Sequence, residues 1–496
     1  MKHDSSQNSI RKIHHILADI LTDYYQGASS EKVLDYHERD QLVGEFYRES
    51  PPAEGIGLAE TLAEFRNGIL AKSVKTWHPL FMNQMFPGAS YPAVLGDCLT
   101  SLMNTTLATW EVAPVATIIE RNVSEWMAGV LGLPEGGSGI FLPGSSLANL
   151  VALTVARNQR LGDRLRQTGL YGRAPAAIVC SQNSHYSIAN AANILGIGEN
   201  HLMRVRTNDC NEMLVDDLVR KVREATAQGI RPFAVVATAG STVTGCMDPI
   251  SDIADVCERF DMHLHVDAAF GGAMTFVPEG KKRLHGIERA DSVCWDAHKS
   301  LHAPLTSTAL LFPNADVLKD CFDSGANYLF HPHAGIPPET EDLGRYTPLC
   351  GKRFDALKLW ILWNAYGTDY FRDFMADRVR LSERFYEMLA KDPDFQPSHK
   401  PCTPLQCFRF LPPALSAGNP DEIDRFHRAV REEIIHRGMA FFNIARLNGR
   451  DHFRTVLINP LTALDDLRRL LEDIRSIGQK YLQSGNSGHA SVVPEN

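Results

Sequence analysis

The sequence lacks the features that would place the protein in a membrane or on a nucleic acid. None of its apolar runs reaches the roughly 18 residues that a membrane-spanning helix requires, and its first residues contain no apolar signal-peptide core. Acidic residues outnumber basic ones by 59 to 50, so the chain also lacks the basic excess that phosphate contacts need. We therefore expect a cytoplasmic protein that binds neither membranes nor nucleic acids.

Paired cysteines are missing as well. The ten cysteines, among them Cys98, Cys180, Cys210 and Cys246, are scattered without the paired spacing of a metal site. A chain of 496 residues is also long enough to fold without disulfides. We expect reduced thiols and no metal centre, in a globular protein whose 44% hydrophobic residues suffice for a large core and a smaller second domain.

The N-terminal region has the pattern of a helical arm. Apolar residues recur at helical spacing from Ile10 to about Arg48, which predicts an amphipathic helix followed by a second one. Pro51 and Pro52 end this region, and its apolar stripe needs a covering surface, for which a partner subunit is the natural candidate. We predict a dimer-swapped arm over residues 1–76 of a homodimer.

Short apolar runs alternate with amphipathic helices between about residues 174 and 312. This pattern predicts strands at residues 176–180, 203–205, 233–238, 263–266, 292–295 and 307–312, and helices at 188–195, 215–227 and 250–260. Apolar strands between helices indicate an α/β fold with a mainly parallel sheet that helices cover on both faces. We predict a large domain over residues 77–366.

The C-terminal third has a different pattern. Residues 327–344 are rich in proline and glycine and suit a mobile lid. Beyond Gly367, a helix, short strands at 405–410 and 455–458 and two further helices predict a small α+β domain over residues 367–484. The polar residues 485–496 are expected to form a disordered tail.

Lys299 follows the predicted strand at 292–295 and is the first candidate for chemistry. Burial disfavours the ammonium form, so we expect a lowered pKa and an amine that can form a Schiff base. The alternative is a lysine that extends to solvent. The strand before it points to the same chemistry, because Asp267 stands where its apolar residues give way to small ones, at the end where ligands bind in α/β sheets.

A carboxylate at Asp267 would keep a pyridine nitrogen protonated, and the cationic ring would then accept electrons from a bond broken at a substrate's α-carbon. Ala269 is small enough for such a ring to lie flat on it. Together with Lys299, these residues are the parts of a site for pyridoxal 5'-phosphate. The alternative for Asp267 is a structural aspartate in a turn.

Ser145 and Ser146 form a Gly-Ser-Ser turn that opens a helix. Such a turn presents free backbone N–H groups, hydroxyls and the positive end of the helix dipole, which suits a phosphate monoester. The same residues could equally form an ordinary helix N-cap.

Several separated motifs resemble the group II pyridoxal phosphate-dependent amino-acid decarboxylases, and most closely their glutamate and cysteine-sulfinate branch. The resemblance covers about residues 77 to 460. It rests on His78-Pro-Leu-Phe-Met-Asn-Gln84, Trp110-Glu-Val-Ala-Pro114, Gly139-Ile-Phe-Leu-Pro-Gly-Ser-Ser-Leu-Ala-Asn149, Ala237-Thr-Ala-Gly-Ser-Thr242, His265-Val-Asp-Ala-Ala-Phe-Gly-Gly272, Asp296-Ala-His-Lys299, Phe354-Asp-Ala-Leu-Lys-Leu-Trp360 and Phe453-Arg-Thr-Val-Leu-Ile-Asn-Pro460.

The resemblance implies a fold-type-I homodimer with a sheet of the seven-stranded type, and it assigns roles to matching residues. Lys299 would bind the cofactor covalently, Asp267 would face its ring nitrogen, and Ala269 and His185 would lie on its two faces. The remaining matches are on the phosphate side, at Ser145, Ser146, Thr242 and His298, and on the substrate side, at Arg454 for the α-carboxylate and Gln84 near the side chain. His185 as a helix-capping residue and Arg454 in a surface ion pair are the plainer alternatives.

The chain departs from the family pattern at two places. Asp296 stands where the family often has asparagine, and because phosphate would repel it, we expect it to turn away or to find its own donor. The family's lid tyrosine, which assists protonation, has Ile336 near its place here. The candidates to replace it are His331, His333 and Tyr346.

The resemblance implies decarboxylation of a small amino acid to the amine and CO₂, with glutamate, aspartate or cysteine sulfinate favoured. Phe81, Met82, Met85 and Phe86 around Gln84 leave aromatic or hydrophobic substrates open. The missing lid tyrosine leaves open oxidative deamination to an aldehyde. A non-catalytic regulatory relative is a further alternative.

Overall fold

The computed structural model describes residues 7–29, 31–162, 164–326, 328–331, 342–416 and 418–483. The chain forms two compact units. The larger unit contains Ala89–Glu383 and His399–Leu405, and the smaller one contains Met1–Gly88, Arg384–Ser398 and Gln406–Asn496. The domain boundaries and the swapped arm expected from the sequence stay predictions. Among the described residues, no helix is both long and apolar enough to cross a bilayer.

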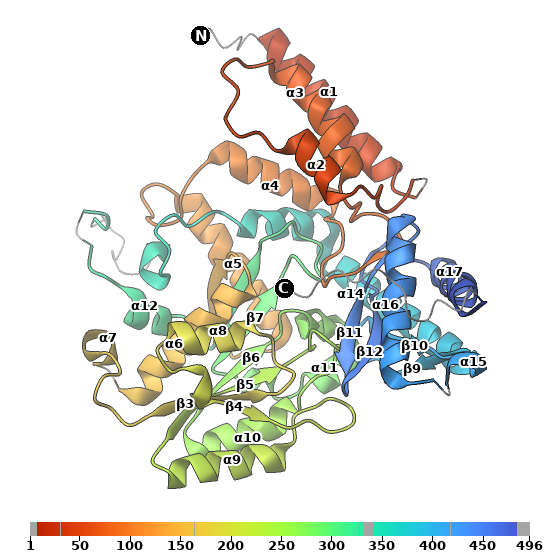
Figure 1. Cartoon of the computed structure of the whole chain (residues 1–496). Coiled ribbons are helices and arrows are strands. Elements are labelled where there is room, and N and C mark those ends of the chain that lie inside the picture. The colour runs from red at the N-terminus through yellow and green to blue at the C-terminus, as the bar shows by residue number, and fades with distance from the viewer. Residues whose placement is uncertain are drawn as a thin grey trace. The chain divides into compact units, whose positions relative to one another are not determined.

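The core of the larger unit is a seven-stranded sheet (Figure 1). In spatial order its strands are β2 (Ser138–Leu142), β8 (Thr308–Phe312), β7 (Ser292–Asp296), β6 (His263–Asp267), β5 (Arg231–Thr238), β3 (Ala176–Ser181) and β4 (Leu202–Val205). From β7 to β4 all neighbours are parallel, whereas β8 is antiparallel to both β7 and β2. The predicted α/β fold with a mainly parallel sheet is therefore confirmed.

Helices cover both faces of this sheet, which explains why its strands are continuous apolar runs. Figure 1 shows α6 (Ser145–Leu161) and α8 (Ser187–Ile194) on one face, and α9 (Val215–Ala227) and α10 (Ile250–Phe260) on the other. Helix α6 packs against β5, β6, β7 and β8, so its buried side reaches the strand ends that carry the candidate site.

Strand β2 is not predicted from the sequence, because its Gly-rich start resembles a turn. Close packing explains the glycine at position 139. A Cβ atom there would lie 1.9 Å from the Leu310 carbonyl oxygen of the neighbouring strand β8. Gly139 therefore allows β8 to pair closely with β2, and it does not mark the end of a strand.

The larger unit contains further helices besides these four. They are α4 (Tyr91–Met103), α5 (Pro114–Leu131), α7 (Leu165–Thr168), α11 (Pro278–Arg283), α12 (Asp316–Phe322) and the first part of α14 (Ala356–Lys391). Helix α14 is interrupted at Gly367, whose φ of 74° lies in the left-handed region that favours glycine. The break therefore falls at the residue where the sequence predicts that the small domain begins.

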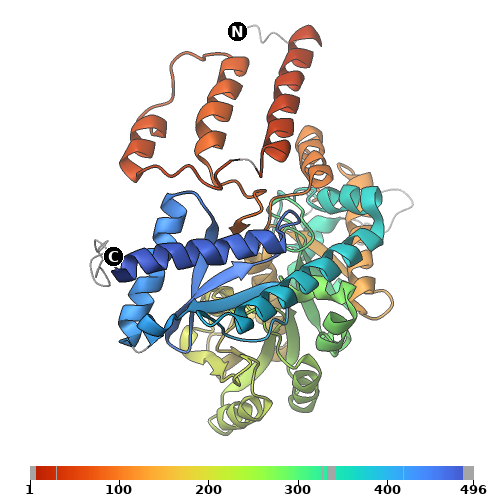
Figure 2. The ribbon, with the colours of Figure 1, turned by 90° about the vertical axis from the view of Figure 1, so that its right-hand side faces the viewer.

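The smaller unit has a five-stranded sheet in the order β1 (Phe81–Met82), β11 (Phe441–Leu447), β12 (Arg450–Val456), β10 (Leu405–Phe410) and β9 (Phe395–Pro397). Figure 2 shows α16 (Pro420–His436) and α17 (Leu464–Gln483) against it. Its other helices are α1 (Gln7–Gln26), α2 (Arg39–Phe46), α3 (Leu58–Glu64) and α15 (Pro413–Ser416), of which α1 and α3 pack side by side.

The strand predicted at 455–458 is wrong in its bounds. Strand β12 begins earlier, at Arg450, because it forms a hairpin with β11. Asn448 and Gly449, with φ values of 49° and 74°, make the turn between the two strands. An Asn-Gly pair is the strongest short hairpin signal in a sequence, and it would have placed both strands correctly.

Candidate active site

The candidate residues of the larger unit gather at the carboxyl ends of the parallel strands. Asp267 ends β6, and Asp296 ends β7 just before Lys299. His185 follows β3, and the loop that contains Thr242 follows β5. Carboxyl ends of parallel strands meet at one edge of a sheet, which is where α/β proteins bind ligands. The charges of Asp267, Lys299 and Asp296 all act on His185, so these four side chains share one site.

Asp267 is a buried carboxylate that is held ionised. Its Oδ2 accepts a hydrogen bond from Asn149 Nδ2 at 3.0 Å, and its Oδ1 accepts one from the Ala269 backbone N–H at 3.2 Å. Burial, the largest single effect, raises the pKa of Asp267, but Lys299, His265 and these hydrogen bonds together lower it below its ordinary value. The site therefore contains a fixed negative charge that can keep a ring nitrogen protonated.

Lys299 is protonated, contrary to the expectation from the sequence. Its Nζ lies 3.1 Å from Asp296 Oδ2. Burial alone lowers the pKa of Lys299, but the charges of Asp296 and Asp267 outweigh it, so the pKa is raised. The expected lowering was wrong because two carboxylates face this lysine. The ammonium must lose a proton before its nitrogen can act as a nucleophile.

Asp296 has found its own donors, as the sequence analysis allowed. It is fully buried, and its Oδ1 accepts a hydrogen bond from the Thr308 hydroxyl at 2.5 Å. Its Oδ2 faces Lys299 and also lies 3.5 Å from His298 Nε2. Asp296 is therefore positioned to accept the proton that Lys299 has to lose.

His185 is half-buried just before α8. Its Nδ1 lies 2.9 Å from the Ser187 hydroxyl, and the Ser187 backbone N–H donates to the same nitrogen at 3.3 Å. Burial lowers the pKa of His185, with Asp267 opposing this and Lys299 adding to it. His185 is thus a neutral ring beside the charged Asp267 and Lys299. Its contacts with Ser187 also fit the alternative in which His185 caps the start of α8.

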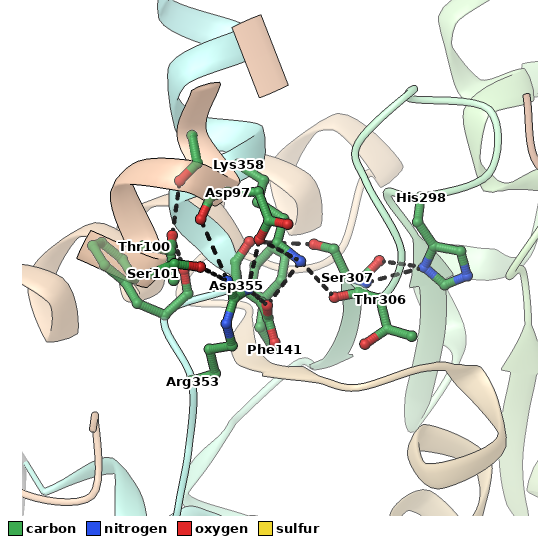
Figure 3. Close-up of polar contacts among 12 residues, drawn as sticks. Asp97, Thr100, Ser101, Phe141, His298, Thr306, Ser307, Arg353, Asp355 and Lys358 are labelled. Carbon is green, nitrogen blue, oxygen red and sulfur yellow. Dashed lines mark hydrogen bonds and ion pairs between the residues drawn. The ribbon is translucent and has the colours of Figure 1, made fainter. Parts of the chain in front are cut away.

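The chain after Lys299 is anchored by a polar cluster (Figure 3). His298 Nδ1 lies 2.9 Å from the Ser307 carbonyl oxygen. Lys358, on α14, donates to the Thr306 carbonyl oxygen at 3.1 Å and pairs with Asp355 at 2.9 Å. These contacts fix the loop between Lys299 and β8, and with it the position of His298.

The phosphate-side residues lie at loops and at a helix start. Helix α6 begins at Ser145, so the N–H groups of Ser145 and Ser146 have no acceptor within the helix, whereas those of Leu147 and Ala148 donate to the Gly144 carbonyl oxygen. Ser146 and Thr242 are exposed, and Ala269 is buried beside Asp267. This set suits a phosphate and a flat ring, and the structure leaves each individual role a prediction.

Arg454 and Gln84 belong to the smaller unit. Arg454 is only 4% exposed, and its Nη1 donates to the Asn83 backbone carbonyl oxygen at 2.9 Å. Within the described part of the chain, its Nε and Nη2 have no hydrogen-bond partner. The plainer alternative, a surface ion pair, is therefore wrong. Gln84, next to Asn83, is exposed.

The lid candidates differ in how they are placed. His331 is exposed, whereas Tyr346 is buried and its hydroxyl donates to Asp316 at 3.3 Å. A buried, hydrogen-bonded phenol is poorly suited to deliver a proton. His333 and Ile336 lie outside the described residues.

Two further site residues escaped the sequence analysis. Asn149 and His265 lie within motifs quoted above. Asn149 donates a hydrogen bond to Asp267, and His265 contacts Asn149 in turn. Asn149 stands four residues after Ser145, so the two residues lie on the same face of α6. That spacing was the available signal.

The donor set fits an aromatic aldehyde that carries a basic ring nitrogen and a phosphate. Lys299 offers an amine, Asp267 a fixed carboxylate, and α6 a helix start. A bound pyridoxal phosphate would supply a ring that accepts electrons from the substrate's α-carbon.

Comparisons with known proteins give the family. The model of the pyridoxal-dependent decarboxylase conserved domain matches residues 54–411. Cysteine sulfinic acid decarboxylase of Mus musculus is 35% identical over 91% of this chain and 92% of its own length. Acidic amino acid decarboxylase GADL1 of Mus musculus is 34% identical over 91% of this chain and 82% of its own length.

A solved structure agrees with these matches. TDC from Oryza sativa, with PLP and tryptamine, superimposes with a TM-score of 0.90 at 27% identity, covering 97% of this chain and 100% of that chain. The fold is therefore that of the fold-type-I pyridoxal phosphate enzymes. The chain belongs to the pyridoxal-dependent decarboxylase family and is a pyridoxal phosphate-dependent amino-acid decarboxylase.

Proposed function

We propose that this decarboxylase acts on a small acidic amino acid, namely glutamate, aspartate or cysteine sulfinate. The observation that carries the proposal is its similarity, over 91% of the chain, to a cysteine sulfinic acid decarboxylase and to an acidic amino acid decarboxylase. Such a substrate has a second acid group, so its site needs one cation for the α-carboxylate and separate donors for the distal acid.

Arg454 is the cation that we assign to the α-carboxylate. A buried guanidinium with two nitrogen atoms lacking partners among the described residues is costly unless an anion binds to it. Burial also lowers the pKa of Arg454, which reflects the same unmet need for a counter-charge. A carboxylate would accept from its free N–H groups in a bidentate contact.

The residues of the larger unit take the remaining roles. Lys299 anchors the cofactor, and Asp296 accepts the proton that the lysine ammonium loses first. Asp267 holds the proton on the ring nitrogen, and the neutral His185 lies against the ring. Gln84 and Asn83 supply amide N–H groups for the distal acid of the substrate.

Substitution of Arg454 by methionine tests this proposal. Arg454→Met keeps side-chain volume and should raise KM for every amino acid by about 10–10²-fold, because a charge-assisted bidentate contact contributes about 1.5–3 kcal/mol. Cofactor affinity should stay unchanged. An unchanged KM would remove Arg454 from this role.

Gln84→Leu separates the distal acid from the α-carboxylate. We expect the variant to have a lower ratio of kcat/KM for acidic substrates to kcat/KM for the substrate leucine, because an apolar group replaces the amide donors. Unchanged discrimination would mean that the distal acid is bound elsewhere. The matched control is Gln182→Leu, an exposed glutamine of the larger unit that bonds to Thr207.

We further propose a homodimer. Helices α4 and α5 expose large apolar side chains, with Leu102 78% exposed and Val115 63% exposed, accompanied by Ile118, Leu99 and Met103. Large exposed apolar side chains of this kind suit a subunit interface. Sedimentation should give a dimer that Leu102→Asp weakens, and a monomeric wild-type protein would contradict the proposal.

A cytoplasmic location is proposed as well. All ten cysteines are free thiols, as is usual in a reducing compartment. Fractionation of cells that express the tagged protein tests this proposal, and recovery from the medium or from membranes would contradict it.

A further inference from the structure

Asn149 lies at the centre of the hydrogen bonds behind the candidate site. It is fully buried on α6, and its carboxamide has four partners, one of which is the Cys294 thiol that donates to Oδ1 at 3.1 Å. The Nδ2 group donates to Asp267 Oδ2 and to Ser187 Oγ, each at 3.0 Å. The Oδ1 atom lies 2.9 Å from His265 Nε2. One amide thus links the carboxylate, a serine, a histidine and a cysteine.

The direction of these hydrogen bonds follows from the charge of Asp267. An ionised carboxylate only accepts, so Asn149 must face it with its nitrogen and must face His265 with its oxygen. His265 Nε2 therefore carries a hydrogen. Its Nδ1 then accepts from the Ser292 hydroxyl at 2.9 Å, and Ser292 Oγ in turn lies 2.8 Å from His263 Nε2, which donates to it.

Both histidines in this chain of hydrogen bonds, His263 and His265, are neutral. Burial lowers the pKa of His265 to about 4 and lowers that of His263 well below its ordinary value. Every donor from His263 to Asn149 consequently points toward Asp267. Aligned bonds in a buried chain polarise one another, so the whole chain stabilises the charge on Asp267.

A second branch runs from Asn149 to His185. Ser187 Oγ accepts from Asn149, so its own hydrogen is available to His185 Nδ1 at 2.9 Å. The Ser187 backbone N–H points to the same nitrogen. His185 Nδ1 is therefore an acceptor, and its hydrogen lies on Nε2, the nitrogen on the other side of the ring.

We propose that Asn149 is a positioning residue that sets two properties of the site at once: the ionised state of Asp267 and the Nε2–H tautomer of His185. The proposal rests on the roles proposed above for Asp267 and His185. Asn149 acts through these two groups and takes no part in the chemistry itself.

Asn149→Leu tests the proposal because leucine keeps the shape and removes every hydrogen bond. We expect the apoenzyme to bind pyridoxal phosphate about tenfold more weakly near neutral pH, as one charge-assisted hydrogen bond is lost. The loss of cofactor affinity should be larger at about pH 5 than at about pH 8, because Asp267 in the variant becomes protonated at a higher pH than in the wild type. A deficit of equal size at both values would indicate a purely structural role and would overturn the proposal.

Histidine ¹⁵N chemical shifts give a readout that does not depend on cofactor or activity. In the wild-type apoenzyme, His185 and His265 should both show the Nε2–H tautomer. Ser187→Ala should disturb the His185 tautomer and leave the pH dependence of cofactor binding intact, whereas His265→Leu should do the reverse. An Nδ1–H tautomer at His185 in the wild-type protein would contradict the second branch.

Two controls distinguish failure of the inference from failure of the proposed roles. Asn158→Leu alters the same residue type on the same helix, where the amide bonds to Cys321 instead of the site, and should leave binding unchanged. If Asp267→Asn binds the cofactor as the wild type does, the role of Asp267 fails. If Asp267→Asn is impaired and a folded Asn149→Leu is not, only the role of Asn149 fails. If Asn149→Leu does not fold, His265→Leu takes its place in this comparison.

Discussion

Lys299 shows how neighbouring charges override burial at a single residue. The sequence placed this lysine at the end of a core strand, but only the structure shows two carboxylates, Asp296 and Asp267, acting on its ammonium. A charged neighbour within about 4 Å can reverse the effect of desolvation on a pKa. In the role proposed for Lys299, its ammonium must therefore lose a proton before the nitrogen can bind the cofactor.

We predict that Lys299→Ala abolishes turnover and leaves the fold intact. The substitution removes the covalent anchor, while Asp296 keeps its hydrogen bond from Thr308. Product formation should fall below detection, with an unchanged far-UV circular dichroism spectrum. A wild-type rate would show that another lysine carries the cofactor.

We predict that Asp267→Asn lowers kcat by about 10²–10³-fold, the usual effect of removing one preorganised electrostatic group. An amide cannot hold a proton on the ring nitrogen as the carboxylate does. The measurement is kcat at saturating cofactor, so that weaker binding does not contribute. Equal rates for the two proteins would remove Asp267 from this role.

The residue types of the site could be predicted from the sequence, but their partners could not. Lys299, Asp267 and His185 stand in local motifs that place them after strands. Asn149 and Arg454 gain their meaning from residues far away in the chain, since Asn149 contacts Asp267 and Arg454 contacts Asn83. Hydrogen bonds of such long sequence separation are not visible in local patterns.

At the scale of elements, a buried ion pair ties α5 to the region around β2. Lys352 Nζ lies 2.5 Å from Glu120 Oε1 and donates to the Phe141 carbonyl oxygen at 2.7 Å. The Phe141 N–H donates back to Glu120 at 2.9 Å. Both charged side chains are almost completely buried.

Glu120→Met should lower the free energy of unfolding by about 3–5 kcal/mol, because it leaves the Lys352 ammonium buried without a counter-charge. The double variant Glu120→Met/Lys352→Met should recover most of this loss. Urea unfolding measures both. The control is Asp369→Ala in the exposed pair with Arg372, expected to cost less than about 1 kcal/mol. A double variant as unstable as the single one would contradict this account.

Buried histidines make stability depend on pH. Burial lowers the pKa of His78, His265 and His427 to about 4 in each case, whereas an unfolded chain binds these protons near about 6.5. Below pH 6.5 the unfolded state thus binds more protons, so each histidine reduces stability as the pH falls toward 4, by up to about 1.4 kcal/mol per pH unit. Asp248, whose pKa burial raises to about 7, acts with the opposite sign.

His427→Gln isolates one of these contributions. Its Nε2 lies 3.0 Å from the Phe410 carbonyl oxygen, and an amide can replace that contact without titrating. The variant should lose less stability than the wild type between about pH 6.5 and about pH 5, as measured by urea unfolding. Parallel curves for the two proteins would show that the pKa of His427 is the same in the folded and the unfolded state.

Elements with a clear apolar period were predicted well, whereas those set by distant contacts were not. Helices α9 and α10 have the bounds expected from their amphipathic pattern. Strand β2 was missed because Gly139 is required by close packing against the neighbouring strand β8, which lies about 170 residues later in the chain. The start of β12 depends on its hairpin with β11.

At the scale of the whole molecule, the central claim is decarboxylation of a small acidic amino acid. Mass spectrometry of the products, with kcat/KM measured for each member of an amino-acid panel, tests this claim most directly. We predict that glutamate, aspartate or cysteine sulfinate gives the highest kcat/KM and yields the amine with one CO₂ released per turnover. A higher kcat/KM for phenylalanine, tyrosine or leucine than for all three acidic substrates would contradict it.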